Sequence, residues 1–121
     1  MTDIQPLYVY KLVPSTAPVR EPLPDQLPVS EIDEKSGFIH LSTAFQIPNT
    51  LNFFFQDEPL VYILRIPYAR VVHDIRWETP DGTHLYNGLR LGKEQIESFS
   101  IWSNENGWEK ALEAAKPWLL Y

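Results

Sequence analysis

The residues best suited to chemistry stand in the segment Gly37 to Thr43, which reads Gly-Phe-Ile-His-Leu-Ser-Thr. The segment predicts a short strand in which Ile39 and Leu41 face one side while His40 and Ser42 face the other. An imidazole and a hydroxyl on one face can hold a ligand by hydrogen bonds, and an imidazole transfers protons near neutral pH. The pattern therefore predicts a pocket lined by His40 and Ser42. The alternative is a buried, hydrogen-bonded histidine beside a helix-capping hydroxyl.

A second group of polar and aromatic residues stands in two later segments, Arg76 to Glu78 and His84 to Tyr86. Between them, Pro80-Asp81-Gly82 is a turn signal, so the two segments are expected to lie side by side as extended chain. Four side chains are then expected to converge on one face: Arg76, Glu78, His84 and Tyr86.

Several established site types are absent from the sequence. It holds no Gly-x-Ser-x-Gly turn for a serine hydrolase, no glycine-rich phosphate loop and no cysteine. The three histidines, His40, His73 and His84, lack the spacing typical of zinc ligands, so no metal site is expected. His73 precedes Asp74 in a solvent-facing alternation and is expected to be ordinary.

Length and charge set further bounds. The 121 residues are expected to form a single domain, residues 1–121, with a core of its own. The formal net charge of −6 argues against binding to nucleic acid, although one local basic pocket could still hold a small phosphorylated ligand. Neither a basic, apolar leader nor an apolar run of membrane length is present, so a soluble, cytoplasmic protein is expected.

The first half of the chain must position the His40 segment. Leu7 to Val13 favours a strand, and the proline-rich residues 14–28 predict a loop folded over the domain. Ser30 to Lys35 predicts a short helix, capped by Ser30 and ended near Gly37. Thr43 and Gln46 resemble a capping box, opening a helix that runs to about Phe55. Its expected core residues are Leu51, Phe54 and Phe55.

The second half predicts three further strands and a final helix. The strands are expected over Leu60 to Ile66, Val71 to Glu78 and Ile96 to Trp102. Asn106 is expected to cap the helix, which would end at Lys116. Its docking stripe is expected to hold Trp108, Leu112 and Ala115. Short strands mixed with a few helices predict an α+β fold.

These motifs, in this order, resemble the family called domain of unknown function 952, and the resemblance extends from about Tyr8 to Ile101. The family is in turn similar to the ADP-ribosyltransferase-like fold, and the segment from His40 to Ile66 is similar to part of the RNA 2′-phosphotransferases. The resemblance implies small, mainly antiparallel sheets with a few flanking helices, and a pocket that holds NAD.

Carried over to this chain, the resemblance makes His40 the pocket histidine and the candidate catalytic residue. Lys11 stands where the resemblance implies a histidine, and no glutamate falls in a motif for the catalytic acid of typical ADP-ribosyltransferases. Glu94 and Glu97 are the nearest candidates, but helix-cap or solvent roles suit them better. The residues that would bind the ligand are Tyr10, Lys11, Ser42, Thr43, Arg76, His84 and Tyr86.

The expected function is therefore binding of NAD or a related ADP-ribosyl or nucleotide compound around His40. ADP-ribosyltransferase-like activity, with NAD as a substrate, is an open option. The alternative is a noncatalytic ligand-binding or protein-interaction module. In that alternative His40 and Arg76 are structural, and a partner meets the surface of Phe53 to Phe55 or of the tryptophans.

Overall fold

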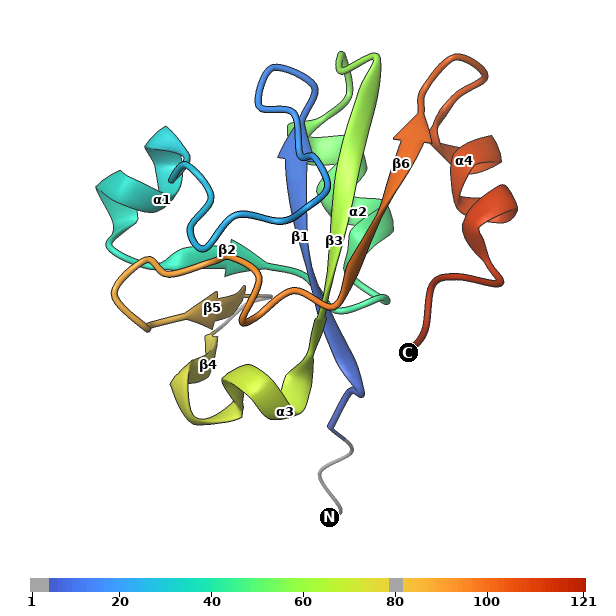
Figure 1. The fold of residues 1–121 in the computed structure, drawn as a ribbon. Coiled ribbons are helices and arrows are strands. Elements are labelled where there is room, and N and C mark those ends of the chain that lie inside the picture. The colour runs from blue at the N-terminus through green and yellow to red at the C-terminus, as the bar shows by residue number, and fades with distance from the viewer. Residues whose placement is uncertain (1–4, 79–81) are drawn as a thin grey trace.

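The structure, a computed structural model, describes residues 5–78 and 82–121. It is a small α+β fold with antiparallel sheets and few helices (Figure 1). Of the predicted turn, Pro80 and Asp81 lie outside the described residues. The elements, in chain order, are β1 (Tyr8–Pro14), α1 (Glu31–Ser36), β2 (Ile39–Leu41), α2 (Ile47–Phe54), β3 (Leu60–Pro67), α3 (Tyr68–Val71), the 3₁₀ turn η1 (Val72–Asp74), β4 (Ile75–Glu78), β5 (Gly82–Leu85), β6 (Ser98–Ser103) and α4 (Trp108–Ala115).

Two three-stranded antiparallel sheets, in the orders β1-β3-β6 and β2-β5-β4, make up the frame. They are joined where Tyr10 and Ser42 form an isolated bridge. The Tyr10 N–H donates to the Ser42 carbonyl, with 2.7 Å between nitrogen and oxygen, and the Ser42 N–H donates to the Tyr10 carbonyl at 2.8 Å. In Figure 1 the strands of the second sheet run across those of the first. This junction brings β1 next to the strand that carries His40.

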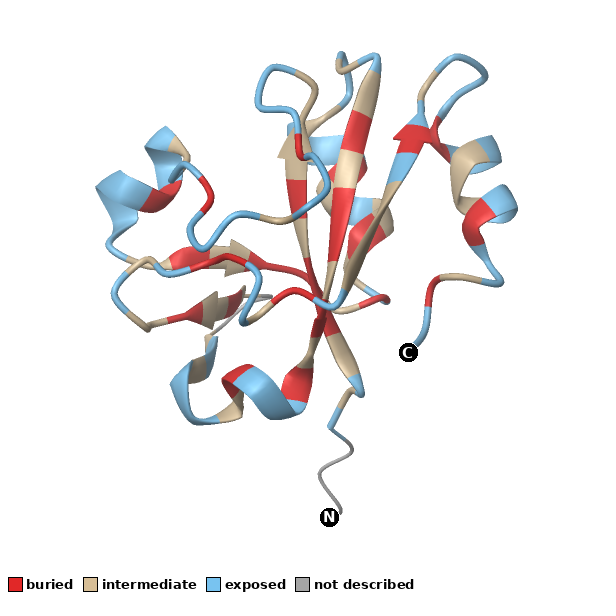
Figure 2. Ribbon diagram, in the orientation of Figure 1, coloured by how far each residue is buried: buried red, intermediate tan, exposed pale blue. Residues whose placement is uncertain are grey.

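The core divides into two clusters of buried side chains, and β1 and β3 contribute residues to both. Figure 2 marks the buried positions along these strands in red. The first cluster lies between the two sheets and includes Ile39, Leu64 and Leu85. The second lies toward α2 and α4 and includes Leu51 and Trp108. The alternation predicted for the His40 strand is present, since Ile39 and Leu41 are buried whereas His40 is partly exposed.

The proline-rich loop packs onto the first cluster through Val19 and Leu27, which are 5% and 9% exposed. The Leu27 N–H donates to the Leu91 carbonyl at 2.7 Å, and the Gln26 amide donates to the carbonyls of Leu27 and Leu89. The loop therefore lies across the fold, as the sequence predicted.

The predicted start of the first helix forms as expected, whereas the second helix begins at Ile47, later than predicted, and has no side-chain cap. Ser30 caps α1, its hydroxyl accepting from the Asp33 N–H at 3.2 Å, and Gly37 ends this helix at a positive φ of 80°. Thr43 and Gln46 form the predicted reciprocal contact. It lies one turn ahead of the first residue of α2, and Ile47 and Leu51 provide the buried face of that helix.

Three local predictions are wrong. The strand expected from Val71 begins at Ile75, because Val71 is drawn into the first core cluster at the end of a helical turn. Asn106 does not cap the last helix: its N-cap residue is Gly107, and no side chain caps it. Phe54 is 71% exposed instead of buried, since Leu51 and Ile47 already fill the inner face of α2.

Candidate functional site

A cleft of about 380 Å³ opens between β2, β5 and α2. Its polar wall includes His40, Ser42 and His84, and an apolar wall is formed by Ile32, Phe54 and Phe55. Ser42 is 4% exposed, and its hydroxyl lies 2.9 Å from that of Thr50. The remaining lining residues are Lys11, Leu12, Leu41, Gln46, Thr50, Gly82 and Thr83.

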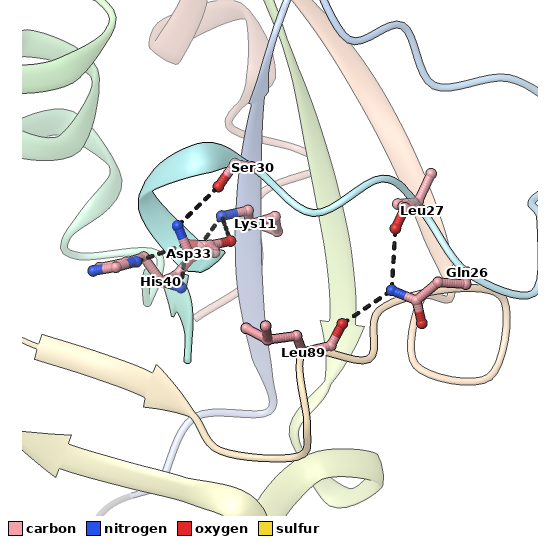
Figure 3. A network of polar contacts seen from close by, with 7 residues as sticks. All are labelled: Lys11, Gln26, Leu27, Ser30, Asp33, His40 and Leu89. Atoms are coloured by element: carbon pink, nitrogen blue, oxygen red, sulfur yellow. Dashed lines mark hydrogen bonds and ion pairs between the residues drawn. The ribbon is translucent and has the colours of Figure 1, made fainter. Parts of the chain in front are cut away.

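His40 is fixed from behind by Asp33, a buried carboxylate of α1 that is 2% exposed (Figure 3). The His40 Nδ1 atom lies 2.6 Å from Asp33 Oδ1, and the His40 backbone N–H donates to the same oxygen at 3.1 Å. Lys11 Nζ donates to Asp33 Oδ2 at 2.6 Å and to the His40 carbonyl at 3.3 Å. Asp33 therefore sets the position of both the ring and the backbone of His40.

The sequence did not predict Asp33 as a site residue, because an acid at the third position of a helix commonly belongs to the helix cap. In the short helix α1, Asp33 is buried while Ile32 beside it is 53% exposed, which reverses the usual preference of these residue types. The available signal was an acid three residues after the capping Ser30, within reach of the basic Lys11 on β1. Such an inversion is expected where a side chain serves a site instead of the core.

Asp33 is ionised despite its burial. Burial alone raises the pKa of Asp33, but the charge and hydrogen bond of Lys11, with the hydrogen bonds from His40, leave that pKa below its usual value. A negative carboxylate at Nδ1 favours the tautomer whose proton points at Asp33. The His40 Nε2 atom is then left as the reactive nitrogen.

The residues predicted to converge from β4 and β5 do meet on one face. Strand register sets Arg76 opposite His84 and His84 opposite His40. Glu78 Oε1 lies 2.5 Å from His84 Nδ1 and accepts from the Tyr86 hydroxyl at 2.6 Å. The Arg76 guanidinium lies over the Tyr86 ring, 4.3 Å from its centre.

These contacts shift two titrations. The hydrogen bond from Tyr86, followed by the one from His84, lowers the pKa of Glu78. The same hydrogen bond raises the pKa of Tyr86 above its usual range. Glu78 is thus negative at neutral pH and holds His84 through Nδ1, as Asp33 holds His40.

An aromatic cluster joins the two histidines. Their ring centres are 5.3 Å apart, and the Phe38 ring lies 4.7 Å from His40 and 4.2 Å from His84. Among the described residues, no protein group is hydrogen-bonded to Nε2 of either imidazole. The side chains of His40 and His84 keep 35% and 19% exposure, respectively.

Three residues expected to bind the ligand lie elsewhere or are already engaged. Tyr10 is fully buried in the second core cluster, and its hydroxyl donates to the Leu120 carbonyl at 2.7 Å, so it does not reach the cleft. Lys11 borders the cleft, but its charge is neutralised by Asp33. The Thr43 hydroxyl accepts from the Gln46 N–H at the start of the α2 turn, outside the cleft lining.

A second, mainly apolar cavity of about 270 Å³ lies beneath the proline-rich loop, on the Asp33 side of β1. Its lining includes Val19, Leu27 and Leu91. Within the described ranges, no three histidine, aspartate or glutamate side chains are grouped as a metal site. His73 is exposed in the 3₁₀ turn η1. No helix in the described part of the chain is both long and apolar enough to cross a membrane.

Residues 20–98 match the model of the family described as "Protein of unknown function (DUF952)". This match covers more than half of the chain, which therefore belongs to that family. None of the curated proteins matches significantly.

Solved structures of protein CC0527 from Caulobacter crescentus share the fold. Its crystal structure is 20% identical, with a TM-score of 0.65 over 79% of this chain and 86% of that chain. Its solution NMR structure is 19% identical, with a TM-score of 0.63 over 84% of this chain and 90% of that chain. At this identity, the likeness shows a common fold.

Proposed function

We propose that this member of the DUF952 family binds NAD or a related ADP-ribosyl or nucleotide compound in the cleft around His40. The observation that carries the proposal is the convergence of His40, Ser42 and His84 on one concave surface, with His40 held by Asp33 from behind. A cleft of about 380 Å³ lies within the usual range of small-molecule sites, about 300 to 1,000 Å³.

Part of the surroundings suits such a ligand. Phe54 and Phe55 line the cleft with apolar surface for a ring. The Ser42 and Thr83 hydroxyls also border the cleft, but both are buried and contact Thr50 and Gln46, so a ligand would have to replace those contacts. Arg76 is exposed on the same sheet face, on the β4 side of His84, and its planar fork can hold two phosphate oxygens at once. In an acidic protein, affinity for phosphate must come from such a local group.

The two small antiparallel sheets, with a histidine on a strand beside a cleft, support an ADP-ribosyltransferase-like arrangement. Transferase chemistry would use His40 as the acid or base. Arg76 would contribute electrostatic binding, and Lys11 would act through Asp33 because its own charge is already neutralised.

Thermal unfolding and isothermal titration with NAD, ADP-ribose, AMP and nicotinamide test the proposal. NAD or ADP-ribose is expected to stabilise the wild-type protein, because a ligand that binds only the folded state raises its stability. His40→Ala is expected to lose the shift, whereas His73→Ala, a matched substitution at an exposed histidine, is expected to keep it. Failure of all four compounds to bind the wild-type protein would contradict the proposal.

The role of Arg76 is tested by Arg76→Lys, which keeps the charge but loses the bidentate fork. The variant is expected to bind NAD or ADP-ribose more weakly than the wild type, while nicotinamide is unaffected. Equal affinities for the dinucleotide would assign Arg76 to stacking on Tyr86 and to the scaffold.

One observation favours the alternative of a protein-interaction module. Phe45, Phe53 and Phe54 are 77%, 77% and 71% exposed, which is unusual for large apolar side chains. A noncatalytic module would use this surface, and the double variant Phe53→Ser/Phe54→Ser would then abolish partner binding. A partner that binds equally well to the double variant would exclude this use of the surface.

A further inference from the structure

His40 and His84 form a symmetrical arrangement that binding alone does not require. They are directly opposite each other on the neighbouring strands β2 and β5, with ring centres 5.3 Å apart. Each has its Nδ1 atom against a carboxylate oxygen, at 2.6 Å for Asp33 and 2.5 Å for Glu78. Both side chains line the same cleft.

A carboxylate at Nδ1 fixes the tautomer and the orientation of an imidazole, and leaves Nε2 as the atom that exchanges protons. Two such rings in one cleft can remove one proton and supply another within a single reaction. With ring centres 5.3 Å apart, both imidazoles border the space that a single bound phosphate group would occupy. The residues therefore have the composition of an acid–base couple.

The charged groups around each ring differ, and this difference assigns the two roles. His40 faces Asp33, whose charge is balanced by Lys11 in direct contact, so the group is electrically neutral when His40 is unprotonated. His84 faces Glu78, which contacts the uncharged Tyr86 hydroxyl and forms no direct ion pair with Arg76 among the described residues. That pair is neutral when His84 is protonated. Arg76 acts on Glu78 only through space, whereas Lys11 contacts Asp33 directly. The closer cation disfavours a proton on His40 more than Arg76 does on His84, which favours His40 as the base and His84 as the acid.

We propose that His40 and His84 together hydrolyse a phosphodiester bond of a nucleotide, with a ribonucleotide 2′,3′-cyclic phosphate as the substrate class. The inference rests on the proposed function, since it uses the same cleft. His40 Nε2 takes a proton from water as the water oxygen bonds to phosphorus. One phosphorus–oxygen ester bond breaks, and the protonated His84 gives its Nε2 proton to the departing ribose oxygen. Solvent then restores both protonation states, so that one water is consumed and no other reactant is needed.

The nature of the leaving group favours this bond over the glycosidic bond of NAD. A ribose oxygen leaves as an alkoxide unless it receives a proton, so a positioned acid lowers the barrier. Nicotinamide leaves NAD as a neutral molecule and needs no proton. A general acid such as His84 would therefore not assist the departure of nicotinamide, whereas ester hydrolysis uses His40 as the base and His84 as the acid.

The test measures hydrolysis of the four 2′,3′-cyclic ribonucleotides by the full chain, across a range of pH. A bell-shaped profile of kcat/KM is expected, because one imidazole must be neutral while the other is protonated. His40→Asn and His84→Asn keep a donor near the carboxylate, and each is expected to lower kcat/KM by about 100-fold or more. His73→Asn, outside the cleft, is the matched control and is expected to have no effect.

Glu78→Gln tests the positioning residue and also provides a second variant if a histidine variant does not fold. It keeps an oxygen for His84 Nδ1 but removes the charge, so kcat is expected to fall while KM changes little. The alkaline limb of the pH profile is expected to move to lower pH. A merely structural Glu78 would not move this limb.

Two results would overturn the inference. One is the absence of turnover of all four cyclic nucleotides by folded wild-type protein, and the other is undiminished turnover in His84→Asn. Titration with ADP-ribose separates the two levels of the account: binding without hydrolysis overturns the couple and leaves the proposed function standing, whereas the absence of both removes both.

Discussion

The two histidine–carboxylate pairs have almost the same contact distance, but their carboxylates differ greatly in burial. The Asp33–His40 pair joins α1 to β2, with Lys11 of β1 bound to the other carboxylate oxygen and only 2% of Asp33 exposed. The Glu78–His84 pair joins β4 to β5, and the Glu78 side chain is 41% exposed. The fold therefore fixes one imidazole through its interior and the other through a strand surface.

This difference in burial indicates that the two histidines differ in mobility within the cleft. A buried ion pair costs a great deal when one partner is removed, because the remaining charge is left without solvent or partner. A partly exposed pair is screened by water and contributes little to stability. We therefore expect His40 to keep one fixed position and His84 to adjust to a ligand.

The largest expected effect comes from Asp33→Asn. The amide still offers an oxygen to His40, but Lys11 loses its counterion at 11% side-chain exposure. The expected loss is about 3 kcal/mol of unfolding free energy, at the low end for a broken buried pair because Lys11 retains some contact with water. Urea unfolding measures it. Glu78→Gln is the matched control, and equal losses in the two variants would contradict the contrast between the pairs.

The Asp33 pair should also appear in the pH dependence of stability. The pKa of Asp33 in the folded protein lies below the ordinary 3.8, so folding is favoured by this group above pH 3.8. The stabilisation is lost as the pH falls through the lower, folded-state pKa. Wild-type stability should therefore drop more steeply than that of Asp33→Asn as the pH falls below about 4. Parallel curves for the two proteins would show that Asp33 is not coupled to folding.

A smaller effect is expected from Gly82→Ala, which tests the His84 pair alone. A Cβ atom at Gly82 would stand 2.5 Å from His84 Cε1 and 2.7 Å from His84 Nε2, so the ring must shift from its present position against Glu78. We expect a loss of about 1 to 3 kcal/mol, typical of overpacking. The double variant Gly82→Ala/His84→Ala removes the clash and should recover part of the loss. A double variant no more stable than Gly82→Ala would place the strain in the backbone instead.

The smallest expected effect concerns the Tyr86 hydroxyl. Its hydrogen bond to Glu78 raises the pKa of Tyr86, so alkaline titration followed by ultraviolet absorbance should show a phenol that ionises above pH 10. Glu78→Gln removes the negative charge and should move this titration down toward the ordinary value. A titration that does not differ between the two proteins would mean that the Glu78 contact is not kept in solution.

The sequence predicted the parts of the site that follow from alternation along a strand. His40 against Ile39 and Leu41, and the convergence of Arg76, Glu78, His84 and Tyr86, needed only the two-residue period and one turn. Asp33 could not be found in this way, because its burial depends on how α1 packs against β1. That packing is a tertiary property with no local period.

Two positions differ from the expectation because of long-range packing. The resemblance placed Tyr10 among the ligand-binding residues, but the bridge to Ser42 leaves its ring on the other side of β1, against Trp118. Val71 is a β-branched residue that favours a strand, but it ends the helical turn α3 and is buried in the first core cluster. At Val71, long-range packing therefore outweighs the local preference for a strand.

The most direct test of the central claim is proton NMR of the three histidines during a titration with ADP-ribose. His40→Asn, His73→Asn and His84→Asn assign the three imidazole Hε1 signals. If the cleft binds the ligand, the signals of His40 and His84 should both move and saturate together, with the larger change at His84, while that of His73 stays in place. A titration in which neither cleft histidine responds, or in which all three respond alike, would contradict the account.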